Sequence, residues 1–202
     1  MINVLIAIGI CIVSYLLGCF SFSRIIAKFF KKLNVYEVGT GFAITENIYH
    51  NISKPLGVLS ASVDAVKIYL FIHLVKWKFS YFGLMDLSFN TMLFIFGFFM
   101  LLGHCLPATH KFRGGRGIFI FTGMLLSFNE ILLPMSITLV IAGILFFVFK
   151  QSRFSQFLIV LFPPLLSIII YDLDHPFIRL MVISAMVMGI INFIVSKRLK
   201  EL

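Results

Sequence analysis

The sequence predicts an all-α polytopic membrane protein with about seven transmembrane helices. Hydrophobic residues make up 60% of the 202 residues, charged residues only 12%, and the mean hydropathy is +1.06. A soluble domain of this size carries about twice that charged fraction. Apolar runs of about 20 residues, the length that a helix needs to cross a bilayer, recur along the chain. We therefore expect residues 1–202 to form a single integral membrane domain.

The expected elements follow from these runs, taken in chain order. The first run is long enough to cross the bilayer and project beyond it, and the longest polar segment, residues 34–55, separates it from the second run. The fourth run has about 11 residues, which is too short for an independent span unless it is tilted or starts inside the preceding loop. The sequence contains no evident internal repeat. The seven runs cover residues 2–30, 56–75, 87–102, 118–128, 131–149, 154–171 and 177–195.

The distribution of positive charge predicts the orientation. If the N-terminus lies outside, inside loops hold 12 of the 17 Lys and Arg residues and outside loops hold 3, while Arg24 and Lys67 lie within runs. Cytoplasmic loops are the ones enriched in Lys and Arg, and this asymmetry arises only with an odd number of crossings. We therefore expect the N-terminus outside and the C-terminus in the cytoplasm. The polar segment and the glycine-rich loop at 103–117 then share the cytoplasmic face.

Composition excludes several classes of function. The net charge of +9 would suit nucleic acid, but the cations fall in short clusters between apolar runs and form no basic face, so we expect no nucleic-acid partner. The three cysteines form no CxxC pair, and His104 and Cys105 lack metal-ligand spacing with any partner. We expect no metal site and no cofactor.

The stretch between the third and fourth runs is the strongest candidate site. It reads Gly103-His104-Cys105-Leu106-Pro107, then Lys111-Phe112-Arg113-Gly114-Gly115-Arg116-Gly117. Glycine lets backbone N–H groups turn towards one centre, and Lys and Arg add charge-assisted hydrogen bonds, so the pattern suits a phosphate. The alternative is a short cytoplasmic loop whose charges only set the topology.

A second candidate lies in the polar segment. Gly39-Thr40-Gly41 suits a tight turn that presents a hydroxyl and N–H groups to an anion, or an ordinary turn. Glu46 beside it opposes anion binding. Within the runs, Asp64 and Lys67 share a helix face, either as a structural ion pair or as the wall of a polar site. Arg24 either snorkels to the surface or reaches an anionic ligand.

Three stretches together, residues 15–28, 38–67 and 103–117, resemble a known family. Their order and spacing are similar to those of the bacterial acylphosphate:glycerol-3-phosphate acyltransferases, small seven-span enzymes of the inner membrane with cytoplasmic active-site loops. The resemblance covers most of the first two thirds of the chain. The family's G-H-x-x-P…K-F-K-G-G-K-G pattern differs here only by Arg113 and Arg116 in place of lysines.

The chain also departs from the family pattern. Phe42 stands where the family has an asparagine, Glu46 where it has a threonine, and His50 where it has an arginine that meets the substrate phosphate. The C-terminal motif lacks its histidine in either register of Asn192. Further departures are Cys19, Ser21, Ser23, Ile44 and Ile68. They indicate a member whose activity has diverged.

The resemblance implies a membrane acyltransferase of the cell (inner, cytoplasmic) membrane. It would move an acyl group from acyl phosphate to glycerol 3-phosphate, giving lysophosphatidic acid for phospholipid biosynthesis, with the acyl tail among membrane lipid. The alternatives are a non-catalytic paralogue that keeps the fold, and a small membrane transporter. Lys111, Arg116 and Thr40 would be catalytic, and Asp64 and Lys67 would form the structural or site-wall pair. The substrate-binding residues would be Gly39, Gly41, Asn47, His50, His104, Arg113, Gly114, Gly115 and Gly117.

Overall fold

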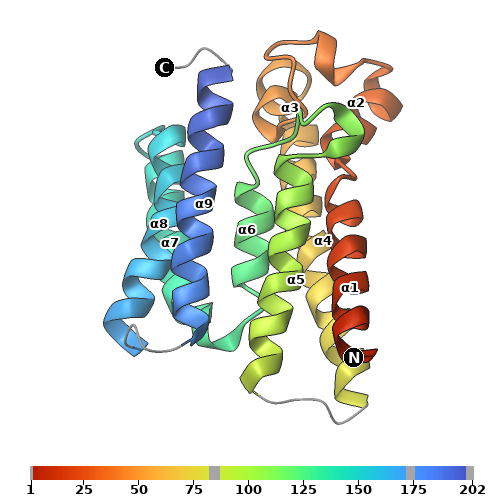
Figure 1. The fold of residues 1–202 in the computed structure, drawn as a ribbon. Coiled ribbons are helices and arrows are strands. Elements are labelled where there is room, and N and C mark those ends of the chain that lie inside the picture. The colour runs from red at the N-terminus through yellow and green to blue at the C-terminus, as the bar shows by residue number, and fades with distance from the viewer. Residues whose placement is uncertain (1, 82–86, 172–175, 199–202) are drawn as a thin grey trace.

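A computed structural model describes residues 2–81, 87–171 and 176–198. Every regular element in these ranges is helical, and they form an upright bundle with short elements gathered at one end (Figure 1). The elements are α1 (Ile2–Gly18), α2 (Phe22–Lys31), η1 (Val35–Glu37), α3 (Thr45–Asn51), α4 (Lys54–Tyr81), α5 (Leu87–Cys105), η2 (Ala108–His110), α6 (Ile118–Leu125), α7 (Asn129–Phe147), α8 (Ser152–Tyr171) and α9 (Pro176–Arg198).

The all-α membrane architecture is confirmed. Within the described ranges, six helical segments are long and apolar enough to cross a membrane, and the first of them takes in both α1 and α2. The remaining predicted run, the fourth in the chain at residues 118–128, contains α6, which has 8 residues. At about 1.5 Å per residue, α6 covers less than half of a ~30 Å hydrocarbon layer. The number of crossings and the side that each terminus faces stay predictions.

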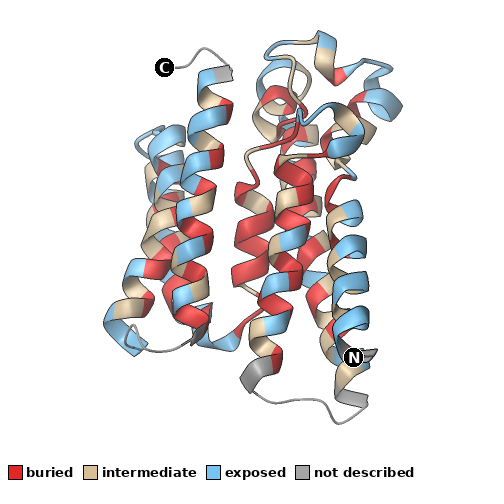
Figure 2. Cartoon of the chain, viewed as in Figure 1, coloured by how far each residue is buried: buried red, intermediate tan, exposed pale blue. Residues whose placement is uncertain are grey.

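The short helix α6 is the centre of the bundle (Figure 2). Seven of its eight residues are buried, and it contacts α4, α5, α7 and α8. Gly123 lets α6 approach α4 closely, because a Cβ there would collide with the backbone carbonyl of Ala65. A segment too short to span the bilayer is therefore shielded from lipid by its neighbours, as a chain with free backbone groups at membrane depth requires.

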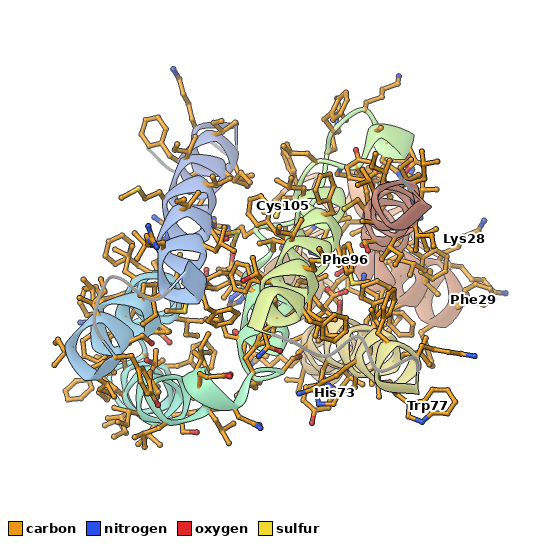
Figure 3. All side chains as sticks on the ribbon, turned by 60° about the horizontal axis from the view of Figure 1, so that its bottom comes forward. Lys28, Phe29, His73, Trp77, Phe96 and Cys105 are labelled. Atoms are coloured by element: carbon orange, nitrogen blue, oxygen red, sulfur yellow. The ribbon has the colours of Figure 1, made fainter. Side chains whose placement is uncertain are left out.

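The outer surface of the bundle is apolar, as a lipid-facing surface must be. Phe29 and Trp77 are 77% and 65% exposed and point away from the bundle, whereas Phe96 lies within it (Figure 3). In a water-soluble protein, exposed apolar side chains in this number would form large apolar patches that promote aggregation. Here they fit the hydrocarbon layer that the hydropathy of the chain predicts.

The first apolar run is not one continuous helix. It breaks between Gly18 and Phe22, and the break leaves backbone carbonyls without intrahelical partners. The ammonium group of Lys67 on α4 donates to the carbonyl of Phe20 at 3.0 Å. At this level α1 packs backbone to backbone on α5, because a Cβ on Gly18 would collide with the carbonyl of Met100. A charge inside the second run thus stabilises the break in the first.

The polar elements gather at one end of the bundle. α2, α3 and the loop between α5 and α6 lie at the same end as the last residues of α9, and the first residues of α1 lie at the opposite end (Figure 1). The two candidate stretches at 38–47 and 103–117 therefore share one face, as the charge distribution predicts.

Candidate active site

A small cavity lies where this polar end meets the core. Its wall is built by α3, α4, α5, α6, α8 and the glycine-rich loop, so it joins segments from most of the chain. It has about 30 Å³ of space for the centres of water-sized molecules. The lining residues are Ile44, Thr45, Glu46, Asp64, His104, Gly115, Arg116, Gly117, Ile118, Phe119 and Gln156.

The glycine-rich loop forms one wall by folding back on the end of α5. The N–H of Gly115 donates to the carbonyl of His104 at 3.1 Å, and a Cβ on Gly115 would lie 2.5 Å from His104 Nε2. Only glycine fits so close to an imidazole. The start of the loop is held by Tyr15 on α1, whose hydroxyl donates to the carbonyl of Leu106 at 2.7 Å and accepts from the N–H of Ala108 at 3.1 Å. The backbone of the loop is therefore held by α1 at its start and by the end of α5 at Gly115.

The loop ends at the N-terminus of α6, which faces the cavity. Gly117 has φ +75°, a conformation that favours glycine, and it places the first residues of α6 in the cavity wall. The first N–H groups of a helix have no intrahelical partner and carry the positive end of the helix dipole. The N–H of Gly115 is already engaged, so the prediction of anion-binding N–H groups now concerns Gly117 and the start of α6.

A buried chain of ionisable groups forms the floor. Asp64 is 1% exposed, with Oδ1 3.7 Å from Lys67 Nζ and Oδ2 4.0 Å from His104 Nε2. The Nδ1 atom of His104 is buried without a hydrogen-bond partner among the described residues. A carboxylate at this depth needs a counter-charge, and Lys67 supplies it. Asp64 and Lys67 therefore form the ion pair that the sequence predicts, and Asp64 also lies in the cavity wall.

Arg116 is held by a carboxylate of the same chain. Its Nε atom lies 3.6 Å from Oε2 of Glu46, and the side chains of the two are 12% and 26% exposed. Gln156 on α8 donates from Nε2 to Oε1 of Glu46 at 2.5 Å. On the other side, Asn192 on α9 donates to the carbonyl of Arg116 at 3.4 Å. The residue at the centre of the predicted phosphate site is thus tied to α3 directly and to α8 through Glu46.

The turn at 38–47 is organised around Asn47, which is fully buried. The side-chain oxygen of Asn47 accepts from the N–H of Thr40 at 3.2 Å and from the side chain of Asn51 at 2.9 Å. Its nitrogen donates to three backbone carbonyls, those of Val35, Val38 and Phe42. Gly39 and Gly41 have φ +56° and +69°, which lets the turn wrap this amide. The hydrogen-bonding groups of Asn47 are therefore used inside the turn.

The predicted site residues fall into two groups. The cavity wall contains Asp64, His104, Gly115, Arg116 and Gly117. The others lie outside that wall, with the side chains of Thr40, His50, Lys111 and Arg113 exposed at the same end of the molecule. The remaining members of this second group are Gly39, Gly41, Asn47, Lys67 and Gly114.

Sequence reasoning missed Gln156 and Thr45 as wall residues. Gln156 lies in an apolar run, and a polar side chain inside such a run is a signal of a polar neighbour. Thr45 and Glu46 belong to the first turn of α3, and only the packing of α3 against the rest of the bundle aims them at the cavity.

Arg24 and Arg113 form a second group of cations, near Tyr36 and outside the cavity wall. Burial raises the pKa of Tyr36 above its ordinary value, while the positive charges of Arg24 and Arg113 act in the opposite direction. The ring of Tyr36 also stacks on His110, with centroids 6.2 Å apart. One nitrogen of Arg24, Nη1, is buried with no hydrogen-bond partner in the part of the chain that the structure describes. Arg24 therefore lies against this loop, and a role towards an anionic ligand stays a prediction.

Comparison with known proteins points in one direction. The sequence model of the family described as "Glycerol-3-phosphate acyltransferase" matches residues 8–201. Proteins with that name from Staphylococcus aureus, strains Newman and JH9, are 30% identical over 143 residues, which is 71% of this chain and 68% of theirs.

Two solved structures share the fold. One is the crystal structure of an integral membrane glycerol 3-phosphate acyltransferase in its glycerol 3-phosphate form, with a TM-score of 0.71 and 23% identity over 95% of this chain and 88% of that one. Its lysophosphatidic acid form has a TM-score of 0.68 and 22% identity, over 94% of this chain and 87% of that one. At this identity the likeness concerns the fold.

Proposed function

This chain belongs to the glycerol-3-phosphate acyltransferase family, and we propose that the cavity beside Arg116 is where it moves an acyl group from acyl phosphate to glycerol 3-phosphate. The product is lysophosphatidic acid, a precursor of phospholipids. The protein is a multi-pass membrane enzyme, and we place it in the cell (inner) membrane with this cavity on the cytoplasmic side.

The observation that carries the proposal is the meeting of Arg116, the first turn of α6 and His104 around one cavity. In the transfer, the acceptor hydroxyl attacks the acyl carbon, the bond from that carbon to the phosphate oxygen breaks, and phosphate leaves with the hydroxyl proton. Negative charge grows on the carbonyl oxygen and on the leaving phosphate. The free N–H groups at the start of a helix are donors that stabilise such charge, while a guanidinium binds the phosphate of the acceptor. Holding the two substrates together supplies the remaining rate.

Apolar residues in the cavity wall support an acyl phosphate as the donor. Ile44, Ile118 and Phe119 contribute apolar wall next to the polar groups. A donor with a charged head and an apolar tail needs this combination, with its tail continuing into membrane lipid. No metal or covalent intermediate enters the proposal.

The transporter alternative is less well supported. It requires Asp64 and Lys67 on a path open to both ends, as in transporters that carry ionisable groups at the midplane. Asp64 is almost completely buried, and Lys67 is engaged by Asp64 and by the carbonyl of Phe20. The pair therefore stabilises packing and one wall of the cavity.

The test is acyl transfer by the purified full chain in lipid, with palmitoyl phosphate and glycerol 3-phosphate as substrates. We expect Arg116→Ala to lower kcat/KM for lysophosphatidic acid formation about 100-fold, the size expected for one lost charged hydrogen-bond partner of the acceptor phosphate. Arg153→Ala is the matched control, because Arg153 is exposed at the start of α8 and lies outside the cavity wall.

Two results would count against the proposal. An Arg116→Ala enzyme with wild-type kcat/KM would place the transfer elsewhere in the protein. A folded wild-type protein that forms no product from several acyl phosphates and acceptors would favour the non-catalytic paralogue.

A further inference from the structure

Glu46 is the feature of the cavity that the proposed transfer does not use. It stands in the first turn of α3, where the helix dipole stabilises a carboxylate. From there it contacts Arg116 at 3.6 Å and accepts from Gln156 at 2.5 Å. These two partners belong to the glycine-rich loop and to α8, so one carboxylate joins three segments at the mouth of the cavity.

The place of this contact shows what an acceptor meets in the cavity. Glu46, Arg116 and Gln156 all line the cavity, so an acceptor that binds there lies beside all three side chains.

Charge shows which of the two contacts of Glu46 an anionic acceptor would displace. Arg116 is the cation in the cavity wall, and Glu46 neutralises it, while Asp64 in the same wall is neutralised by Lys67, which lies outside the wall. A phosphate that binds Arg116 competes with the Glu46 carboxylate for the same guanidinium, and the two anions repel each other when close. An uncharged acceptor has no such competition.

We propose that Glu46 is a specificity-determining residue, an internal anion that competes with the acceptor phosphate for Arg116 and so weakens the binding of anionic acceptors. The inference rests on the proposed function, because it takes Arg116 as the phosphate-binding group. Glu46 makes no contact with the reacting bonds in this scheme, so it changes the affinity for the acceptor and not the rate of the chemical step.

The experiment compares Glu46→Gln with wild type in two assays on the full chain in lipid. The first is calorimetric binding of glycerol 3-phosphate and of glycerol, and the second is steady-state acyl transfer. Glu46→Gln keeps the shape and removes the charge. Glu37→Gln is the matched control, because Glu37 is exposed on the same polar segment and bonds to Asn34, away from the cavity.

We expect Glu46→Gln to lower the Kd and the KM for glycerol 3-phosphate about tenfold, the effect of one partly buried ion pair, with kcat changed less than about threefold. Binding of glycerol and all constants of Glu37→Gln should stay at wild-type values. An unchanged or raised Kd for glycerol 3-phosphate in Glu46→Gln would overturn the proposal. Equal tightening towards glycerol would also overturn it, because the effect would then be one of space and not of charge.

The assays separate this inference from the proposed function. Tighter glycerol 3-phosphate binding by Glu46→Gln without any product would support the role of Glu46 while the transfer reaction fails. Product formation with unchanged binding would do the reverse. Gln156→Leu keeps Glu46 charged but removes the hydrogen bond that helps to hold its carboxylate beside Arg116. A phosphate then displaces Glu46 more easily, and we expect the Kd for glycerol 3-phosphate to fall about threefold. This variant keeps the test decisive if Glu46→Gln does not fold.

Discussion

The turn at 38–47 and the loop at 103–117 lie at the same end of the molecule and share a composition of glycine and polar residues. They differ in where their polar groups point. In the turn, the buried side-chain amide of Asn47 forms hydrogen bonds with the surrounding backbone N–H and carbonyl groups, so these groups face inward. In the loop, glycines press the chain onto α5 and leave Arg116 and the start of α6 at the cavity. Similar residue patterns thus yield a structural turn in one place and the wall of a cavity in the other.

The largest effect that tests this contrast is on stability, from Asn47→Ala. The substitution leaves the buried carbonyls around it and the N–H of Thr40 without partners, which we expect to cost about 3 kcal/mol. Thermal unfolding of the purified protein in detergent measures it. Asn51→Ala is the control, because Asn51 gives this amide a single hydrogen bond. If Asn47→Ala unfolded like wild type but lost activity, the turn would be a substrate site, as the sequence pattern predicts.

Gly115→Ala tests the other half of the contrast, and its effect should fall on activity. The new Cβ would lie 2.5 Å from His104 Nε2, so either the imidazole or the loop must shift. We expect kcat/KM to fall about 30-fold, because a shift of this kind disturbs the geometry around the reacting groups. Gly143→Ala, where a Cβ meets nothing within 4 Å, should retain wild-type kcat/KM. Full activity in Gly115→Ala would show that the fit of the loop on His104 is not needed for transfer.

The smallest effect should come from Thr40→Ala. Thr40 is exposed, and it contributes its backbone N–H to the turn, which alanine keeps. We expect kcat/KM and the melting temperature to change less than about twofold and about 2 °C, within the range of ordinary surface substitutions. A tenfold loss of kcat/KM at an unchanged melting temperature would instead make Thr40 the catalytic residue that the family resemblance implies.

Much of the candidate site was open to prediction because one loop carries it. His104, Gly115, Arg116 and Gly117 lie within one stretch between two apolar runs, so a local pattern of glycine and cations was enough to find them. Lys111 and Arg113 belong to the same pattern, yet their side chains are exposed outside the wall. Composition identifies such a loop, but it does not say which of its side chains turn inward.

The sequence by itself determined the class of fold and the family of this protein. Helix length and apolarity are local properties, and in a bilayer a chain with these long apolar runs can satisfy its backbone hydrogen bonds by forming membrane-spanning helices. The tertiary structure alone decided that the short segment α6 forms the core, that Asn47 faces its own turn, and that Glu46 meets Gln156, 110 positions away in the chain. Contacts over such separations depend on how whole helices pack, which no local pattern records.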